Sequence, residues 1–192
     1  SIERIFRLCF QQLNNLKNAP GASGPTPSIA PDFREFASAI KFLRNLQVRN
    51  AINISYQEIK SHPQLILHID EDHRTSEEAK QFAFLINVEP EKTRYVLTFS
   101  PDPNKDNQIK VATRSLLGIM FYLSQAVEVP DQDILQGKVT QTKTPDGNIF
   151  DWKEMTGDLL RIRSISEKPE AGFVSISYRG AWFYIHDSDL SS

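Results

Sequence analysis

The sequence predicts an α+β fold in which helices pack on a mixed or antiparallel sheet that ends in a three-stranded C-terminal meander. Two kinds of pattern lead to this prediction. In several segments apolar residues recur at three- and four-residue spacing, which is typical of amphipathic helices. In others they alternate with polar residues, which is typical of strands. The clearest alternation lies near the C-terminus, where residues 172–187 read GFVSISYRGAWFYIHD.

This C-terminal segment predicts a β-hairpin that turns at Gly180, because glycine readily takes the positive φ of a tight turn. A turn at residues 180–181 or at 179–180 leaves the same side chains on each face. The large apolar ones, predicted to face the core, are Ile176, Tyr178, Phe183 and Ile185. A preceding strand over residues 159–165 completes the meander.

The first half of the chain predicts two helices joined by a linker. Residues 1–18 carry an apolar stripe at helical spacing, and residues 32–49 carry another, preceded by a capping box of Asp32 and Glu35. Between them, residues 19–31 are rich in proline, glycine and serine, which predicts a linker. We therefore expect residues 32–192 to form a single α+β domain.

The middle of the chain alternates between the two patterns. Strands are predicted over residues 52–59 and 64–69, with a turn at His62-Pro63 between them, and over residues 93–100. A helix capped by Thr75 extends to about Asn87. The most apolar helix is predicted over residues 111–127. Because apolar side chains surround it on almost every side, we expect it to lie at the centre of the core.

Composition excludes several classes of protein. The chain has 192 residues and a net charge of −2, so it lacks the positive charge of a nucleic-acid-binding protein. The single cysteine, Cys9, excludes an intrachain disulfide. No apolar run approaches the ~18 residues of a membrane helix. Since the chain starts with Ser1, we expect it to be a processed product or a fragment without its native start.

Three segments resemble a family of uncharacterised bacterial proteins, some of which are similar to envelope lipoproteins. They read TRSLLGIMFYLSQAVEVP at residues 113–130, FDW at 150–152 and YRGAWFYIHDSDL at 178–190. The resemblance covers less than half of the chain. It implies the cell envelope or periplasm as the compartment, with the cytoplasm as the alternative, and it implies no activity. In the family pattern the last segment continues into another helix, so the resemblance also implies that a C-terminal helix is missing after Ser192.

One short cluster suggests metal chemistry. His68, Asp70 and Asp72 fall on one side of an extended chain and could converge on a divalent metal, which makes a small metal-dependent hydrolase the alternative function. Acidic residues just before a helix also stabilise its N-terminus, and we favour that interpretation. We expect no metal and no other cofactor, and the sequence contains no catalytic signature.

A binding surface is predicted on the second face of the C-terminal sheet. Its cationic and aromatic side chains are Arg161, Arg163, Arg179, Trp182 and Tyr184. Such a mixture can stack on a ligand or anchor a protein partner. The favoured alternative is that residues 131–146 or the first helix cover this face. We expect a non-enzymatic binding or assembly module of the bacterial envelope, acting through a protein partner or self-association.

Overall fold

The structure, a computed structural model, describes residues 1–59, 62–102 and 105–189 and confirms the α+β fold. The chain divides into two compact units. The first comprises Ser1–Pro20 and Asp32–Ser115, and the second comprises Gly21–Pro31 and Leu116–Ser192.

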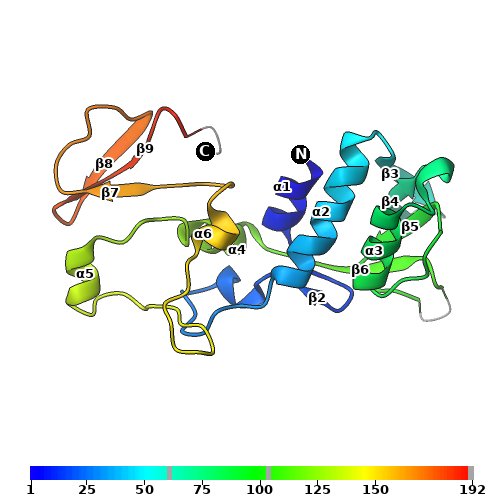
Figure 1. Cartoon of the computed structure of the whole chain (residues 1–192), viewed down its shortest axis with the longest axis horizontal. Helices are drawn as coiled ribbons and strands as arrows, with labels where there is room; N and C mark the ends of the chain where they lie inside the picture. Colours follow the sequence, from blue (N-terminus) through cyan, green and yellow to red (C-terminus); the bar gives the residue numbers. More distant parts are fainter. Residues whose placement is uncertain (60–61, 103–104, 190–192) are drawn as a thin grey trace. The chain divides into compact units, whose positions relative to one another are not determined.

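The first unit is a six-stranded mixed sheet with three helices, α1 (Ile2–Cys9), α2 (Arg34–Val48) and α3 (Glu77–Leu85), which lie side by side in Figure 1. The strand order is β2-β1-β6-β5-β4-β3, and every pair is antiparallel except β5 with β6. The strands are β1 (Phe10–Leu13), β2 (Leu16–Lys17), β3 (Ile52–Ile59), β4 (His62–Ile69), β5 (Arg94–Thr98) and β6 (Gln108–Thr113).

The core of the first unit lies between the helices and one face of the sheet. The apolar stripe of α2 is fully buried there, and alternate residues of the central strands meet it. This agrees with the two periodicities in the sequence, since period 3.6 places one stripe of a helix inward and period 2 places one face of a strand inward. The strand residues of this core include Leu67, Ile69, Tyr95, Leu97, Ile109 and Val111.

The first helix ends at Cys9, so the prediction of a helix over residues 1–18 is wrong beyond that point. The chain continues as the hairpin of β1 and β2, which turns at Asn14 with φ of 46°. Asparagine tolerates this left-handed conformation better than most residues. The side-chain amide of Asn18 donates to the carbonyls of Arg7 at 2.9 Å and Phe10 at 2.6 Å, which satisfies groups that a longer helix would have paired.

Other local signals of the first unit are displaced by one or two residues. Helix α2 starts after Phe33 and no side chain caps it, so the predicted capping box of Asp32 and Glu35 is wrong. Helix α3 is capped by Ser76 rather than by Thr75. His62 and Pro63 belong to β4, so the turn predicted there is wrong, and the residues between β3 and β4 lie outside those described.

The prediction of a central helix over residues 111–127 is wrong in two respects, the residue at which the helix starts and the extent of its burial. Residues up to Thr113 belong to β6, where Ile109 and Val111 alternate into the core. The helix itself, α4 (Leu116–Ser124), belongs to the second unit. Its Leu116 and Met120 are 77% and 60% exposed, whereas Tyr122 is buried, so only one side of this helix is covered.

The second unit contains short helices and a three-stranded antiparallel sheet (Figure 1). Its strands are β7 (Arg163–Ile165), β8 (Val174–Tyr178) and β9 (Ala181–Ile185), and its further helices are η1 (Pro20–Ser23), α5 (Asp131–Leu135) and α6 (Lys153–Thr156). Strand β9 lies in the middle of this sheet, between β7 and β8, so the order of the strands in the sheet differs from their order in the sequence. Strand β7 is shorter than the predicted strand over residues 159–165.

The predicted linker is joined to the second unit by hydrogen bonds. The Lys143 amide donates to Ser28 at 2.9 Å, and the Ala30 amide donates to Lys143 at 2.8 Å. The Thr142 hydroxyl donates to the Pro27 carbonyl at 2.6 Å. Residues 21–31 are therefore packed in this unit. The single domain expected over residues 32–192 stays a prediction.

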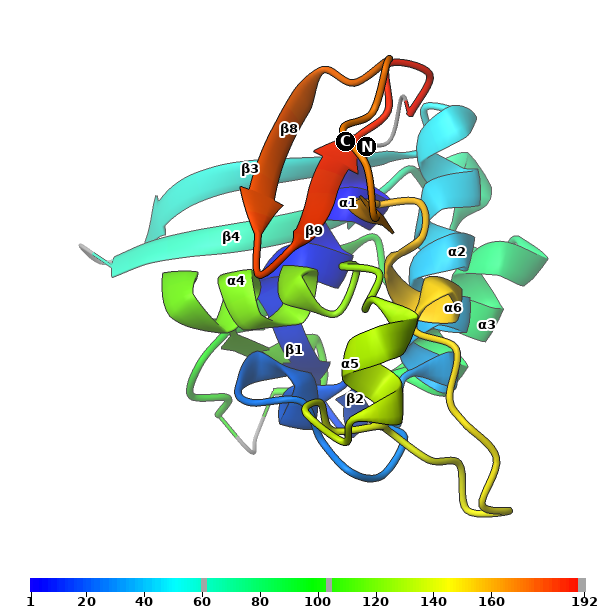
Figure 2. The same cartoon turned by 90° about the vertical axis from the view of Figure 1, so that its left-hand side faces the viewer.

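The predicted C-terminal hairpin is formed by β8 and β9 (Figure 2), but its apolar face is not buried. Arg179 and Gly180 form the turn with φ of 50° and 81°, which fits a two-residue hairpin turn with two positive φ values. The face predicted to be inward carries Val174, Ile176 and Tyr178, which are 48%, 59% and 57% exposed. The prediction that this face lies in the core is therefore wrong.

No helix in the described part of the chain has the length and apolar character needed to cross a membrane.

Candidate functional site

The second unit contains a cavity of about 300 Å³ whose walls come from residues 125–161. Most of the lining is apolar or aromatic, including Val127, Val129, Ile134, Phe150, Trp152 and Leu160. A concave, mainly apolar site with a few polar groups is the usual form of a small-ligand pocket, and this volume is near the lower end of the usual range.

Hydrogen bonds between distant segments hold the walls of this cavity. The amide of Glu128 donates to the carbonyl of Ile162 at 2.8 Å, and the amide of Ile162 donates to Ala126 at 3.1 Å. On another side, the amide of Phe150 donates to the carbonyl of Thr142 at 2.9 Å. The extended segments 126–128 and 142–150 thus have their backbone groups fixed by partners outside regular sheets.

Two aromatic side chains of the FDW segment line the cavity. The rings of Phe150 and Trp152 meet edge to face, with centroids 5.2 Å apart and planes at 85°. This is a favourable geometry for an aromatic pair. Phe150 is buried, whereas Trp152, just before α6, is partly exposed. The indole is therefore the aromatic group that a ligand can reach.

Four charged residues line the same cavity: Glu128, Asp151, Lys153 and Arg161. Arg161 donates from Nε and Nη2 to Oε1 of Glu128, at 3.2 and 2.9 Å. Lys153 Nζ lies 3.7 Å from the same oxygen. Asp151 accepts a hydrogen bond from the Lys153 amide on Oδ1, at 2.9 Å. Glu128 Oε1 therefore meets both side-chain cations of the cavity.

The residues described around the cavity include no histidine, cysteine or serine. The hydroxyl of Thr142 donates to Pro27 and that of Thr156 donates to the Trp152 carbonyl, so both are used by the fold. A nucleophile beside a general base, which acyl transfer requires, is not formed by these side chains.

The five residues predicted to form a binding surface do not converge. Arg163, Trp182 and Tyr184 share one face of the C-terminal sheet, as their pairing shows. Arg161 lies before β7 and binds Glu128 in the cavity, while the guanidinium of Arg179, in the turn, lies 5.3 Å from the ring of Tyr178. A role of these residues in binding stays a prediction.

The candidate metal ligands have other surroundings. His68 Nε2 lies 3.1 Å from the hydroxyl of Ser55 on the neighbouring strand, and Asp70 is exposed in front of η2 (Glu71–His73). Within residues 1–59, 62–102 and 105–189, no group of three histidine, cysteine, aspartate or glutamate residues is placed to hold a metal ion.

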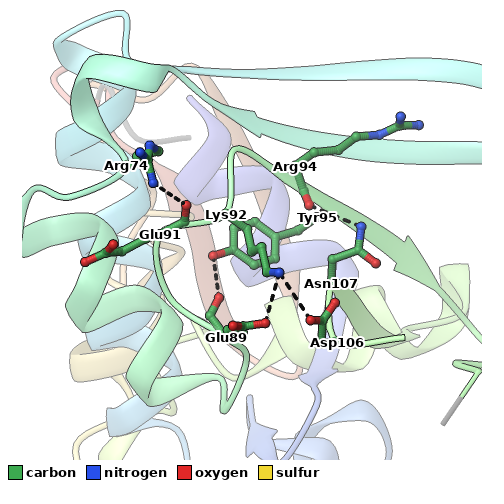
Figure 3. A network of polar contacts seen from close by, with 8 residues as sticks. All are labelled: Arg74, Glu89, Glu91, Lys92, Arg94, Tyr95, Asp106 and Asn107. Atoms are coloured by element: carbon green, nitrogen blue, oxygen red, sulfur yellow. Dashed lines mark hydrogen bonds and ion pairs between the residues drawn. The ribbon is translucent and has the colours of Figure 1, made fainter. Parts of the chain in front are cut away.

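A second polar group lies in the first unit, around Lys92 (Figure 3). Its ammonium group lies 3.0 Å from a carboxylate oxygen of Glu89 and 3.2 Å from one of Asp106, and the hydroxyl of Tyr95 donates to the Glu89 carbonyl at 2.9 Å. The carboxylates of Glu89 and Asp106 raise the pKa of Lys92. Hydrogen bonding to Glu89 and then to Lys92 lowers the pKa of Asp106. This cluster joins the loop before β5 to the loop before β6.

The chain matches no protein-family model, no curated protein and no solved structure.

The sequence did not predict this cavity, although two of its parts were noted for other reasons. Sequence reasoning singled out Arg161 as a binding residue and FDW as a motif, but it missed Glu128. The only signal at Glu128 is a carboxylate beside apolar residues in the sequence AVEVP. That signal is too common to indicate a site.

Proposed function

We propose that the chain is a non-enzymatic binding module and that the cavity of the second unit takes up an apolar group of its ligand. The observation that carries this proposal is a cavity of about 300 Å³ with mainly apolar walls and a partly exposed indole at Trp152. Moving an apolar group from water into such a site is favourable by about 0.8 kcal/mol for each buried methylene.

The cavity and the exposed hairpin face support two modes of binding. The cavity has room for a small ring or a branched aliphatic chain. The apolar face of β8, with Val174, Ile176 and Tyr178 about half exposed, is the surface that supports contact with a protein partner or self-association. The bacterial envelope is the compartment we propose, and the support for it is the resemblance of the three segments named above.

Fluorescence of Trp152 tests uptake into the cavity. The chain has two tryptophans, so a Trp182→Phe background leaves Trp152 as the only indole. Titration with the neutral probe 3-phenylpropan-1-ol should change the emission of Trp152 in a saturable way. The variant Val139→Phe, which adds a ring to the cavity wall, should weaken this binding about tenfold or more.

Ile176→Phe is the matched control, because it adds a ring at an exposed position of the same unit outside the lining. It should leave probe binding unchanged. The proposal fails if the probe gives no saturable change at millimolar concentration, or if Val139→Phe binds it as well as the Ile176→Phe control does.

A further inference from the structure

We propose that the ligand of this cavity is an organic amine with an apolar body, recognised by the carboxylate of Glu128. This inference depends on the proposed function, because it assigns the polar end of the ligand whose apolar end enters the cavity. The evidence is the unequal use of the two carboxylate oxygens of Glu128, together with the aromatic wall beside it.

Glu128 keeps one hydrogen-bond acceptor available. Both N–H groups that Arg161 directs to it, and the ammonium of Lys153, meet Oε1. Among the described residues, Oε2 has no partner. The side chain is 29% exposed, so solvent or a ligand can reach it. A carboxylate oxygen in a partly buried site gains most from a charged donor, since charge-assisted hydrogen bonds are stronger than neutral ones.

Asp151 also has a carboxylate oxygen left unused by the described residues, but this residue is exposed, so it contributes less than Glu128. Asp151 accepts the Lys153 amide on Oδ1 at 2.9 Å, and Oδ2 has no partner within the described part of the chain. Asp151 lies next to Trp152 in sequence, and both line the cavity. An ammonium group is attracted to the face of an indole as well as to a carboxylate. The wall thus combines two acceptors for a cation with an aromatic surface.

The cations of the cavity are less available to a ligand. Arg161 is held by two hydrogen bonds to Glu128, and binding an anion there would compete with that carboxylate. The side chain of Lys153 is 58% exposed, so its ammonium is well hydrated and offers little net gain to a ligand anion. The geometry therefore favours a cationic head group over an anionic one.

Three probes with one apolar body test this inference at pH 7: 3-phenylpropylamine, 3-phenylpropan-1-ol and 3-phenylpropionate. Their affinities are measured by calorimetry and by Trp152 fluorescence in the Trp182→Phe background. The amine should bind about 10- to 100-fold more tightly than the alcohol, as expected for a charge-assisted hydrogen bond. The variant Glu128→Gln should reduce this preference to about threefold or less while the alcohol still binds. That retained binding shows that the variant is folded.

Glu167→Gln removes an exposed carboxylate outside the cavity and is the matched control. It should keep the full preference for the amine. Equal binding of amine and alcohol, tighter binding of the propionate, or an unchanged preference in Glu128→Gln would overturn the inference and leave the cavity as an apolar site. Absence of binding by all three probes would instead refute the proposed function itself.

Discussion

Arg114 is predicted to be the charged residue on which the first unit depends most strongly. Its side chain is 6% exposed. Nη1 donates to the carbonyls of Arg7, Leu8 and Phe10 at 2.9, 3.2 and 2.8 Å, and Nη2 donates to the carbonyl of Asn18. The first three carbonyls lie where α1 ends and β1 begins, and that of Asn18 directly follows β2. The guanidinium thus satisfies helix-end carbonyls that have no partner inside the helix.

The variant Arg114→Met should destabilise the first unit by about 3–5 kcal/mol. Hydrogen bonds from a charged donor contribute about 1.5–3 kcal/mol each, but they share one group and do not add. Removal of the guanidinium also leaves several carbonyls buried without a donor. Part of this loss is offset because the variant no longer buries a charged group, which removes the cost of desolvating the guanidinium. The stability of Arg114→Lys should lie between those of the wild type and Arg114→Met, because one ammonium cannot reach all four carbonyls.

Urea unfolding followed by circular dichroism measures this change. Because the two units can unfold separately, hydrogen exchange at the amides of β1 identifies the transition of the first unit. Lys41→Met is the control, since it removes a positive charge at an exposed position of α2 and should change stability by less than about 0.5 kcal/mol. A loss below about 1 kcal/mol in Arg114→Met would refute the reasoning.

Three further predictions follow from the structure. Tyr95→Phe removes the donor to the Glu89 carbonyl and should lower the free energy of unfolding by about 0.5–1.5 kcal/mol, measured in urea. Burial raises the pKa of Tyr95 above its ordinary 10.0. The stabilisation by the neutral phenol should therefore be fully present below pH 10.0 and be lost as the pH rises through the pKa of the folded protein. Carbon-detected NMR should show that Asp106 has a pKa below its ordinary 3.8. The contribution of this carboxylate to stability should therefore be present above pH 3.8 and be lost as the pH falls through the pKa of the folded protein. Lys92→Met should raise the pKa of Asp106. Ile40→Ala, at a fully buried position, should lower the free energy of unfolding by about 2–5 kcal/mol. Ile176→Ala, at an exposed position, should lower it by less than about 1 kcal/mol. Equal losses of stability would show that the hairpin face is covered.

The apolar periodicity of the sequence predicted several helices and strands correctly. The apolar stripe of α2 matches its buried face, and alternate residues of β4 and β5 enter the core, so the α+β fold and these elements could be predicted. Strand β3 was predicted from an alternation that does not match its burial, since Ile54 and Tyr56 are 37% and 67% exposed. The hairpin of β8 and β9 was predicted for the same reason, since Gly180 fixes the turn and the alternation fixes the faces. Alternation alone cannot say whether another element covers a face, and here the apolar face is exposed.

The boundaries that failed are decided by contacts far along the chain. Residues 10–13 continue a helical stripe, yet they form β1 because β6 provides a paired strand and Arg114 binds the carbonyls of the preceding turn. Residues 111–113 continue an apolar run, yet they belong to β6 because β1 provides an antiparallel partner at residues 10–13. Tertiary pairing of this kind overrides local propensity.

The cavity could not be predicted because no single segment contains it. Its walls come from extended stretches that have no regular partner strand and are positioned by single hydrogen bonds, such as that from Glu128 to Ile162. A glutamate at position 128 has no pattern that separates it from any exposed carboxylate. Its distinct chemistry arises only when Arg161, 33 residues later, occupies one oxygen and Lys153 approaches the same atom. The specificity proposed for this site is thus a property of the folded second unit, and Glu128→Gln tests it directly because the substitution changes the charge and keeps the shape of the side chain.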